Sequence, residues 1–256
     1  MYSKMDIYFL LELSVITFML GILDSSFGQG YGTIGTPLLL FLNLGPKVVV
    51  PSILFSQFIV ASIATFMHHK LNNVNFKTFK THDAKRFYVF SVSGLISVIL
   101  ASVIGATISS IYIRYYIGIM VTVIGILVLL NLKAKFTWWK ASIIGIISAF
   151  NKGLTGGGFG PVVTGGQKII GINGKSTVGV TLSSVAIICI TGFITWTILN
   201  GLPPIYILIA MGISGAISSF VGPYITKISN EQILRFLLGG IILVLGIITL
   251  LGIAKA

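Results

Sequence analysis

Charged residues are scarce in this sequence. Only 9% of its 256 residues are charged, with 17 lysines and arginines against five aspartates and glutamates, whereas 55% are hydrophobic. Soluble globular domains carry about 25% charged residues. A helix that crosses a bilayer needs roughly 20 mainly apolar residues, so the chain has material for about six to eight crossings. This composition excludes most soluble enzymes, nucleic-acid-binding modules and disulfide scaffolds.

Metal-ligating and nucleophilic residues are also few. The single cysteine, Cys189, cannot form an internal disulfide, and its apolar neighbours indicate a small buried side chain. The three histidines surround one loop, where only Asp83 is near enough in sequence to act as a further metal ligand. No nucleotide-binding loop, zinc-protease motif or nucleophile–base pair is recognisable. We therefore predict no enzyme activity, no bound metal and no cofactor. The histidines are His68, His69 and His82.

Long apolar runs are the main feature that is present. None alternates apolar and polar residues, and helices can satisfy every backbone group inside lipid, so we predict an all-α polytopic membrane protein. The first run follows no basic region or cleavage site, so we expect it to be retained. The long runs are Ile7–Leu23, Val48–Met67, Phe87–Ile108, Tyr115–Leu132, Trp138–Phe150, Val178–Leu199, Pro204–Ile225 and Ile233–Ile253.

The net charge of +12 indicates orientation in a membrane rather than nucleic-acid binding. Lysine and arginine gather in the cytoplasmic loops of membrane proteins. The basic connections at residues 68–86 and 131–140 are therefore expected to be cytoplasmic, in a multi-pass protein of the cell membrane. Trp138 and Trp139, beside the second connection, are typical of a membrane interface.

The sequence repeats itself weakly. A shift of about 124 residues aligns Gly32 with Gly156 and Pro37 with Pro161, and with small gaps Arg114 aligns with Arg235. The order of these matches predicts two homologous halves, 1–132 and 133–256, that form one transmembrane domain. Each half would contain one glycine-interrupted element, followed by three transmembrane helices.

The two interruptions lie at residues 25–37 and 151–161. Glycine allows the backbone to leave helical geometry, and proline suits the first turn of a new helix. Each interruption should therefore separate a helix from a short second helix whose N-terminus favours an anion. Two such loops that face each other would form one site near the membrane midplane. Close helix packing is the alternative explanation, and it suits scattered glycines such as Gly118 and Gly125.

Two motifs stand at matching places in the halves, Gly28-Gln-Gly-Tyr-Gly-Thr with Thr36-Pro-Leu-Leu-Leu, and Gly156-Gly-Gly-Phe-Gly-Pro-Val-Val-Thr. With the two-half layout and the long basic loop, they resemble the sulfite exporter TauE/SafE family of bacterial and archaeal membrane permeases. The resemblance implies transport of small sulfur-containing or organic anions, such as sulfite or sulfonates. The sequence departs from the family at Asn151-Lys152, where related chains often have an acidic or small residue.

Two topologies are compatible with the pattern. If each interrupted element crosses once, the chain has eight crossings and parallel halves. If each is a re-entrant hairpin, the halves are inverted and one face collects more basic residues. Trp138–Phe150 is short for a crossing, which also favours the inverted arrangement. The basic residues gained by that face are Lys168, Lys175, Lys227 and Arg235.

An anion transporter needs hydrogen-bond donors and positive potential. Lys152 is the only basic residue inside either interruption, so we predict that it attracts the anion, although it could instead reach the headgroups. Asp24 and Glu12 are candidates for a coupling proton, and Asp24 could alternatively cap the loop. The other predicted substrate-binding residues are Gly28, Gln29, Gly30, Gly32, Thr33, Thr36, Asn151, Thr155, Gly156, Gly157, Gly158 and Gly160.

Further side chains could supply hydrogen bonds to the anion, namely the hydroxyl groups of Ser25, Ser26 and Thr164. Ser56 and Ser184, at matching positions in the halves, are weaker candidates, because hydrogen bonding between helices is the more common role of such serines. We predict a secondary transporter that works by alternating access, driven by H+ or Na+, with the lipid bilayer and a small anion as its partners. An anion channel is the alternative, and a membrane-embedded enzyme is a more distant one.

Overall fold

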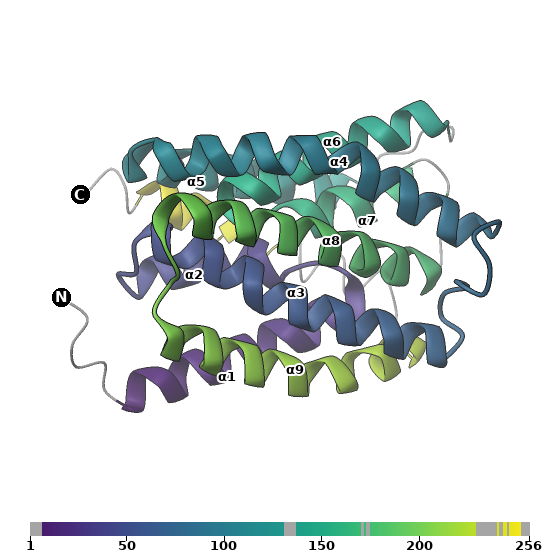
Figure 1. Ribbon diagram of the computed structural model, residues 1–256, viewed down its shortest axis with the longest axis horizontal. Coiled ribbons are helices and arrows are strands. Elements are labelled where there is room, and N and C mark those ends of the chain that lie inside the picture. Colours follow the sequence, from purple (N-terminus) through teal and green to yellow (C-terminus); the bar gives the residue numbers. More distant parts are fainter. Residues whose placement is uncertain are drawn as a thin grey trace.

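The computed structural model describes residues 7–130, 137–169, 172, 175–228, 240, 243–244 and 246–251 (Figure 1). Within these residues every regular element is a helix, and the described positions from 240 to 251 are helical as well. The labelled helices are α1 (Ile7–Phe27), α2 (Tyr31–Phe41), α3 (Pro46–Lys70), α4 (His82–Thr107), α5 (Ser110–Leu130), α6 (Trp138–Thr155), α7 (Phe159–Ile169), α8 (Lys175–Asn200) and α9 (Ile205–Ile228).

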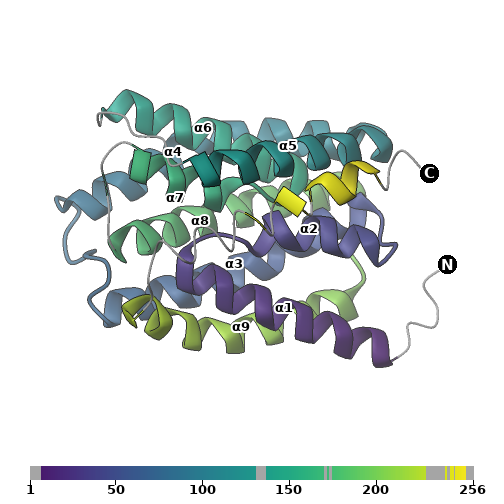
Figure 2. The ribbon, with the colours of Figure 1, turned by 180° about the vertical axis from the view of Figure 1, so that it is seen from behind.

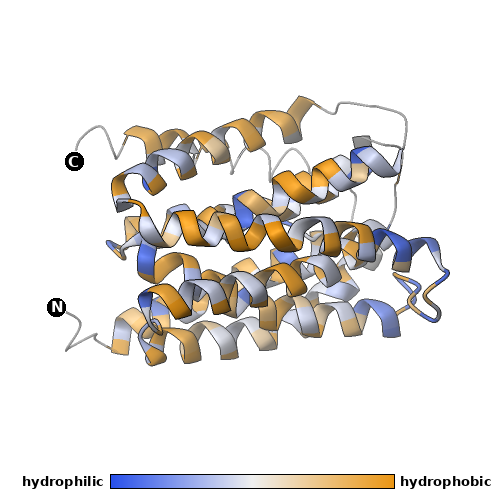
Figure 3. Cartoon of the chain, turned by 45° about the horizontal axis from the view of Figure 1, so that its top comes forward, coloured by the Kyte–Doolittle hydropathy of each residue, from blue (hydrophilic) through white to orange (hydrophobic). Residues whose placement is uncertain are grey.

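The prediction of a helical multi-pass membrane protein is confirmed. Six of the described helices are long and apolar enough to cross a membrane, namely α1, α3, α4, α5, α8 and α9. Their outward surfaces carry large apolar side chains such as Ile96 and Ile198, which suit contact with lipid. Hydrophilic residues gather at the helix ends, most visibly in the loop between α3 and α4 (Figure 3).

The predicted basic connection at residues 68–86 is wrong in its extent. Helix α3 continues to Lys70 and α4 begins at His82. The Thr81 hydroxyl caps α4 by accepting the Ala84 N–H at 3.2 Å, so Lys85 and Arg86 belong to a helix. Of the second connection, residues 131–136 lie outside the described residues, as does most of the predicted run Ile233–Ile253.

The chain reverses direction twice at glycine-rich breaks. After α1, the short α2 runs back towards the end of the molecule at which α1 begins (Figure 2). After α6, the short α7 likewise returns towards the start of α6, close to where α8 begins. Both short helices were predicted, but the breaks between helices are only three residues long, Gly28–Gly30 and Gly156–Gly158.

Proline marks the start of only one of the two short helices. Pro161 is the third residue of α7, as predicted, whereas Pro37 lies inside α2, which begins six residues earlier at Tyr31. Gly30 precedes α2 with a φ of 112°, a conformation that side chains rarely adopt, so this glycine determines where α2 begins.

The helices pack in a regular arrangement. Helix α1 lies along α9, α6 lies along α4, and α3 and α8 pack against each other between these pairs. Gly118 and Gly125 on α5 allow close approach of the C-terminal helical segment, because a Cβ on either would lie within 2.7 Å of Leu250 or Leu243. The prediction that these two glycines serve helix packing is confirmed.

Candidate substrate site

The two breaks, together with the first turns of the short helices that follow them, are in direct contact, although they are more than 100 residues apart in sequence. A Cβ atom added to Gly32 would lie 1.8 Å from the carbonyl oxygen of Gly156. A Cβ added to Gly160 would lie 2.5 Å from the carbonyl oxygen of Gly28. Only glycine permits backbone segments to approach this closely, so the glycines serve the contact as well as the turns.

Threonine hydroxyls join the breaks across this contact. The Thr33 hydroxyl accepts the backbone N–H of Gly158 at 3.1 Å, and the Thr36 hydroxyl donates to the carbonyl of Thr155 at 3.0 Å. From α7, the Thr164 hydroxyl donates to the carbonyl of Gly28 at 3.2 Å. These bonds satisfy backbone groups that lie at the C-terminal ends of α1 and α6 and at the start of α7, where helical partners are missing.

An acid and a base lie beside the breaks, joined by an amide. Gln57 on α3 donates from Nε2 to Asp24 Oδ2 at 2.8 Å, and its Oε1 accepts from the ammonium of Lys152. All three side chains are buried, with exposed fractions of 1% for Asp24, 3% for Gln57 and 1% for Lys152. We call these three residues the central bridge, which connects α1, α3 and α6. A charge buried this deeply needs such partners.

The Lys152 ammonium has further partners. It donates to the carbonyl of Gly156 and interacts with the side chain of Cys189 on α8. The Gly156 carbonyl and Gln57 Oε1 take two of the three N–H donors of the lysine, and Cys189 lies close to the ammonium. The alternative that Lys152 reaches the headgroups does not fit this burial. In this conformation Lys152 would act on an anion through its charge rather than through a direct hydrogen bond.

The carbonyls at the end of α1 receive side-chain donors from neighbouring helices. His68 Nε2 lies 2.8 Å from the Ser25 carbonyl oxygen, and the Thr226 hydroxyl donates to the Ser26 carbonyl at 2.6 Å. Asn73 Nδ2 lies 3.1 Å from His68 Nδ1 and 3.2 Å from the Pro223 carbonyl oxygen. Since both contacts of Asn73 Nδ2 are donations, His68 is neutral with its proton on Nε2. His68 therefore supplies a donor to a backbone carbonyl at the end of α1.

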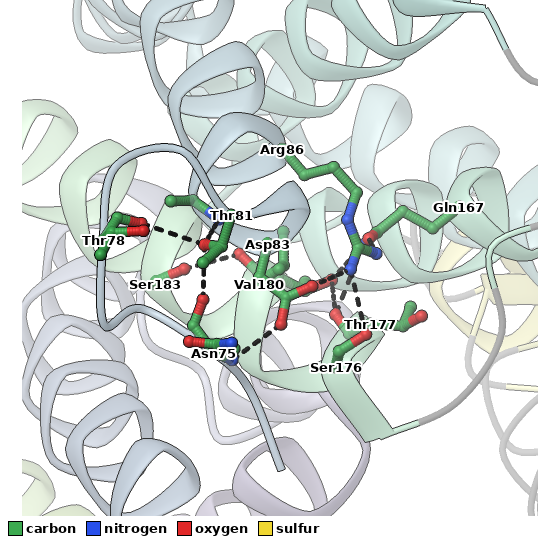
Figure 4. Close-up of polar contacts among 12 residues, drawn as sticks. Asn75, Thr78, Thr81, Asp83, Arg86, Gln167, Ser176, Thr177, Val180 and Ser183 are labelled. Atoms are coloured by element: carbon green, nitrogen blue, oxygen red, sulfur yellow. Dashed lines mark hydrogen bonds and ion pairs between the residues drawn. The ribbon is translucent and has the colours of Figure 1, made fainter. Parts of the chain in front are cut away.

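A second charged group lies at the end of the molecule that holds the α3–α4 loop (Figure 4). Arg86 on α4 forms an ion pair with Asp83 and donates to Gln167 Oε1 at 2.8 Å and to Ser176 Oγ at 3.0 Å. Asp83 also accepts the backbone N–H of Asn75 at 2.7 Å. We call Asp83, Arg86, Gln167 and Ser176 the peripheral cluster, which joins α4 to α7 and α8.

A line of hydrogen bonds leads from the peripheral cluster to the first break. Gln167 donates to the Thr181 hydroxyl at 3.0 Å, and the Thr164 hydroxyl lies 3.2 Å from Thr181 Oγ1. Thr164 also contacts the Gly28 carbonyl, as described above. Gln167, Thr181 and Thr164 thus connect the peripheral cluster to the first break.

Most of the residues predicted from sequence gather here. Asp24 and Lys152 join the central bridge, and most of the predicted glycines and threonines take part in the contact between the breaks. Asn151 is buried and accepts a hydrogen bond from Tyr116 at 2.6 Å. Glu12 is not brought to the site, because it lies on the exposed surface of α1 three helical turns before Asp24.

Several of the predicted donors and hydroxyl candidates form hydrogen bonds within the protein. Backbone N–H groups beyond the first turn of α2 are used within the helix, and those of Gly157 and Gly158 bond to threonine hydroxyls. Four of the serine candidates donate to the carbonyl four residues earlier in their own helix, a common role of helical serines. They are Ser25, Ser26, Ser56 and Ser184.

Sequence reasoning missed several residues of the site. Gln57 lies in an apolar run with no motif, although a lone amide in a transmembrane helix is itself a signal. Arg86 was assigned to a loop, and Cys189 was expected only to fill space, whereas it contacts Lys152. Among the described residues, no group of histidine, cysteine and carboxylate side chains could hold a metal ion.

Comparison with known proteins gives a consistent result. The model of the family described as sulfite exporter TauE/SafE matches residues 13–249. The chain is 24% identical to the probable membrane transporter protein YtnM of Bacillus subtilis, covering 94% of this chain and 83% of that protein. It is 27% identical to the probable membrane transporter protein MJ0441 of Methanocaldococcus jannaschii, covering 98% of this chain and all of that protein. No solved structure matches the chain.

Proposed function

This chain belongs to the sulfite exporter TauE/SafE family and is a multi-pass membrane transporter, and we propose that it carries small anions by secondary transport. Its substrates would be sulfur-containing or organic anions, such as sulfite or sulfonates. The family and the names of the relatives indicate transport rather than catalysis.

One observation carries the anion proposal, namely the buried Lys152 beside two contacting helix breaks. The first turns of α2 and α7 begin at these breaks, and helix N-termini favour negative charge. The central bridge keeps the positive charge of Lys152 in a water-poor region, where its field is weakly screened. An anion that enters between the breaks would meet both kinds of positive potential.

The tight contact between the breaks supports alternating access. Since not even a methyl group fits between Gly32 and Gly156, an anion that binds at this point would require the breaks to separate. We propose two inverted halves, 1–132 and 133–256, each with a re-entrant hairpin. Both hairpins reverse at glycines. If the halves are related, α1 corresponds to α6 and α4 corresponds to α9. The packing of α1 along α9 and of α6 along α4 is the pairing that this relation requires. Movement of one half relative to the other would open the site alternately.

The inverted arrangement assigns the end with the α3–α4 loop to the cytoplasm. Lys70, Lys77, Lys80 and Lys85 lie there, in keeping with the preference for positive charge inside. A reporter fused at Ala256 should then report an extracytoplasmic C-terminus. A cytoplasmic signal from this fusion would contradict the inverted arrangement and would favour eight crossings.

Asp24 is our candidate for carrying a coupling proton. It is buried, and its contact with Gln57 ties it to Lys152 and hence to the occupancy of the site. Protonation of Asp24 would leave Lys152 with an unbalanced positive charge, which would strengthen anion binding. Glu12 is the weaker candidate because it is exposed on α1.

The proposal is tested with purified protein and with proteoliposomes. Thermal unfolding is measured with sulfite, thiosulfate, sulfate, sulfonates, small carboxylates and small cations as ligands, since specific binding raises the unfolding temperature. We expect one or more anions to stabilise the protein. The stabilising anion should then be taken up faster into vesicles preloaded with the unlabelled anion, which distinguishes a carrier from a channel. Stabilisation by neutral or cationic ligands alone would refute the anion proposal.

Lys152→Gln should reduce uptake at low anion concentration about tenfold or more. The variant loses one favourable charge interaction with the anion, and a loss of about 1.4 kcal/mol weakens binding tenfold. Lys47→Gln is the matched control, since Lys47 is exposed at the start of α3. Unchanged uptake by the Lys152→Gln protein would refute the role of Lys152 while leaving the transport proposal open to the ligand screen.

A further inference from the structure

The surroundings of the Lys152 ammonium resemble those of a bound ion. Its partners come from three places in the fold, namely the Gly156 carbonyl at the end of α6, the Gln57 amide oxygen on α3 and Cys189 on α8. None of them is on the exposed surface. The ammonium therefore lies inside a closed shell of acceptors rather than in an ion pair on one helix.

These acceptors are the kind that hold a small monovalent cation. Carbonyl oxygens at the C-terminal end of an interrupted helix carry negative potential, and such groups coordinate the cations of other secondary transporters. Asp24 supplies a carboxylate behind Gln57, and its Oδ1 has no hydrogen-bond partner among the described residues. A positive charge at this position thus balances the buried carboxylate while Asp24 is ionised.

We propose that this shell is a monovalent-cation site that the chain fills with its own lysine. The ligands are the Gly156 carbonyl and Gln57 Oε1, with Asp24 as the balancing carboxylate. When Lys152 is shortened, the site takes up a free cation of similar size, such as ammonium, methylammonium, Na+ or K+. In the intact protein the ammonium of Lys152 occupies the site, so the protein needs no Na+ to hold the two breaks in contact.

The first experiment measures thermal unfolding of the Lys152→Ala protein in N-methylglucamine chloride and in chlorides of the four small cations. We expect a lower unfolding temperature than that of the unchanged protein in N-methylglucamine. The temperature should rise saturably with ammonium or another small cation, by about 4 °C at tenfold excess over the dissociation constant. This readout requires no transport, so it stands even if the anion proposal fails.

Two variants control for other effects. Lys152→Met removes the charge but keeps the volume, so it should leave no room for a cation and show no saturable rise. The double variant Asp24→Asn with Lys152→Ala removes both charges, so it should fold in N-methylglucamine and respond weakly to small cations. Lys47→Ala reports the effect of losing an exposed lysine.

Several results would overturn the inference. These are a Lys152→Ala protein that responds to small cations no more than the Lys152→Met protein does, and an equal saturable response from the unchanged protein. Failure to recover folded Lys152→Ala protein from purification in ammonium, when the Lys152→Met protein is recovered, would also count against it.

The consequence for transport depends on the proposed function and is measured separately. Replacing Na+ by N-methylglucamine should change anion uptake by the unchanged protein less than twofold. Strict dependence of uptake on Na+ would contradict the inference that Lys152 takes the place of a free cation. Absence of uptake in either salt would instead contradict the anion proposal and leave the unfolding measurements as the test of the cation site.

Discussion

The central bridge and the peripheral cluster both join an acid to a base, but in different ways. In the peripheral cluster Arg86 contacts Asp83 directly, and the two residues are one turn apart on α4. In the central bridge the charges of Asp24 and Lys152 lie on different helices and meet through the amide of Gln57. The first ion pair can persist whatever the other helices do, whereas the second exists only while α1, α3 and α6 keep their positions.

This difference indicates which of the two groups depends more strongly on the relative positions of the helices. Separation of the two breaks would pull Lys152 away from Gln57 and leave buried charges without partners, which is costly in a low-dielectric region. Separation of α7 and α8 from α4 would cost the peripheral cluster only its bonds to Gln167 and Ser176, and Arg86 would keep Asp83. We therefore expect the charges of the central bridge to depend on whether the breaks are in contact. The peripheral cluster should hold α7 and α8 against α4 more weakly.

The largest effect is expected where the two breaks approach each other most closely. Gly32→Ala should destabilise the protein by about 3 kcal/mol or more, because the new methyl group would overlap the Gly156 carbonyl and backbone cannot easily yield. Thermal unfolding of the purified protein is the measurement.

Gly165→Ala is the matched control near the peripheral cluster, since nothing lies within 4 Å of a Cβ at that position on α7. It should be neutral or stabilising by about 0.5–1 kcal/mol, as alanine is in a helix. Equal effects of the two substitutions would show that the contact between the breaks is not a tight one.

Removal of the bridging amide should have the next largest effect. Gln57→Leu would leave Asp24 and Lys152 each with one partner fewer in a buried position, and we expect a loss of about 2–3 kcal/mol. Gln167→Leu in the peripheral cluster should cost less, about 1–2 kcal/mol, because Arg86 keeps Asp83 and Ser176. Chemical unfolding of both variants gives the two values, and a reversed order would contradict the central role of Gln57.

Arg86→Lys tests whether the peripheral cluster needs the guanidinium rather than a positive charge. Arg86 reaches Gln167 with one terminal nitrogen and Asp83 and Ser176 with the other. A lysine keeps the charge but offers one nitrogen, so we expect a loss of about 1–2 kcal/mol. A variant as stable as the parent protein would show that charge alone maintains the cluster.

The smallest effect is expected from Asp83→Asn. Asparagine can still accept the Asn75 backbone N–H, so only the ion pair with Arg86 is lost. At the edge of the molecule this pair should contribute about 0.5–1 kcal/mol, and the difference should shrink in 1 M salt. A larger, salt-independent loss would mean that the pair is as well shielded as the central bridge.

Several features of the site could be predicted from the sequence. The glycine-rich stretches predicted breaks in helices, because glycine adopts the positive φ angles seen at Gly30 and Gly156 with the least steric cost. Lys152 and Asp24 were recognisable as rare charges in apolar surroundings. The partners of these groups were not predictable, since Gln57 and Cys189 are distant in sequence and belong to no motif. The width of the breaks was overestimated, because hydrogen bonding continues the helices through Thr155 and from Tyr31.

By itself, the sequence determined that the chain lies in a membrane, that its elements are helices and that two glycine-rich segments interrupt them. These properties follow from local composition and from the conformational range of single residues. Only the tertiary structure decided that the two breaks touch, that Gln57 links Asp24 to Lys152 and that Arg86 joins three helices. Such contacts depend on how distant helices pack, because the partners of a buried charge are selected by position in space and not by position in the chain.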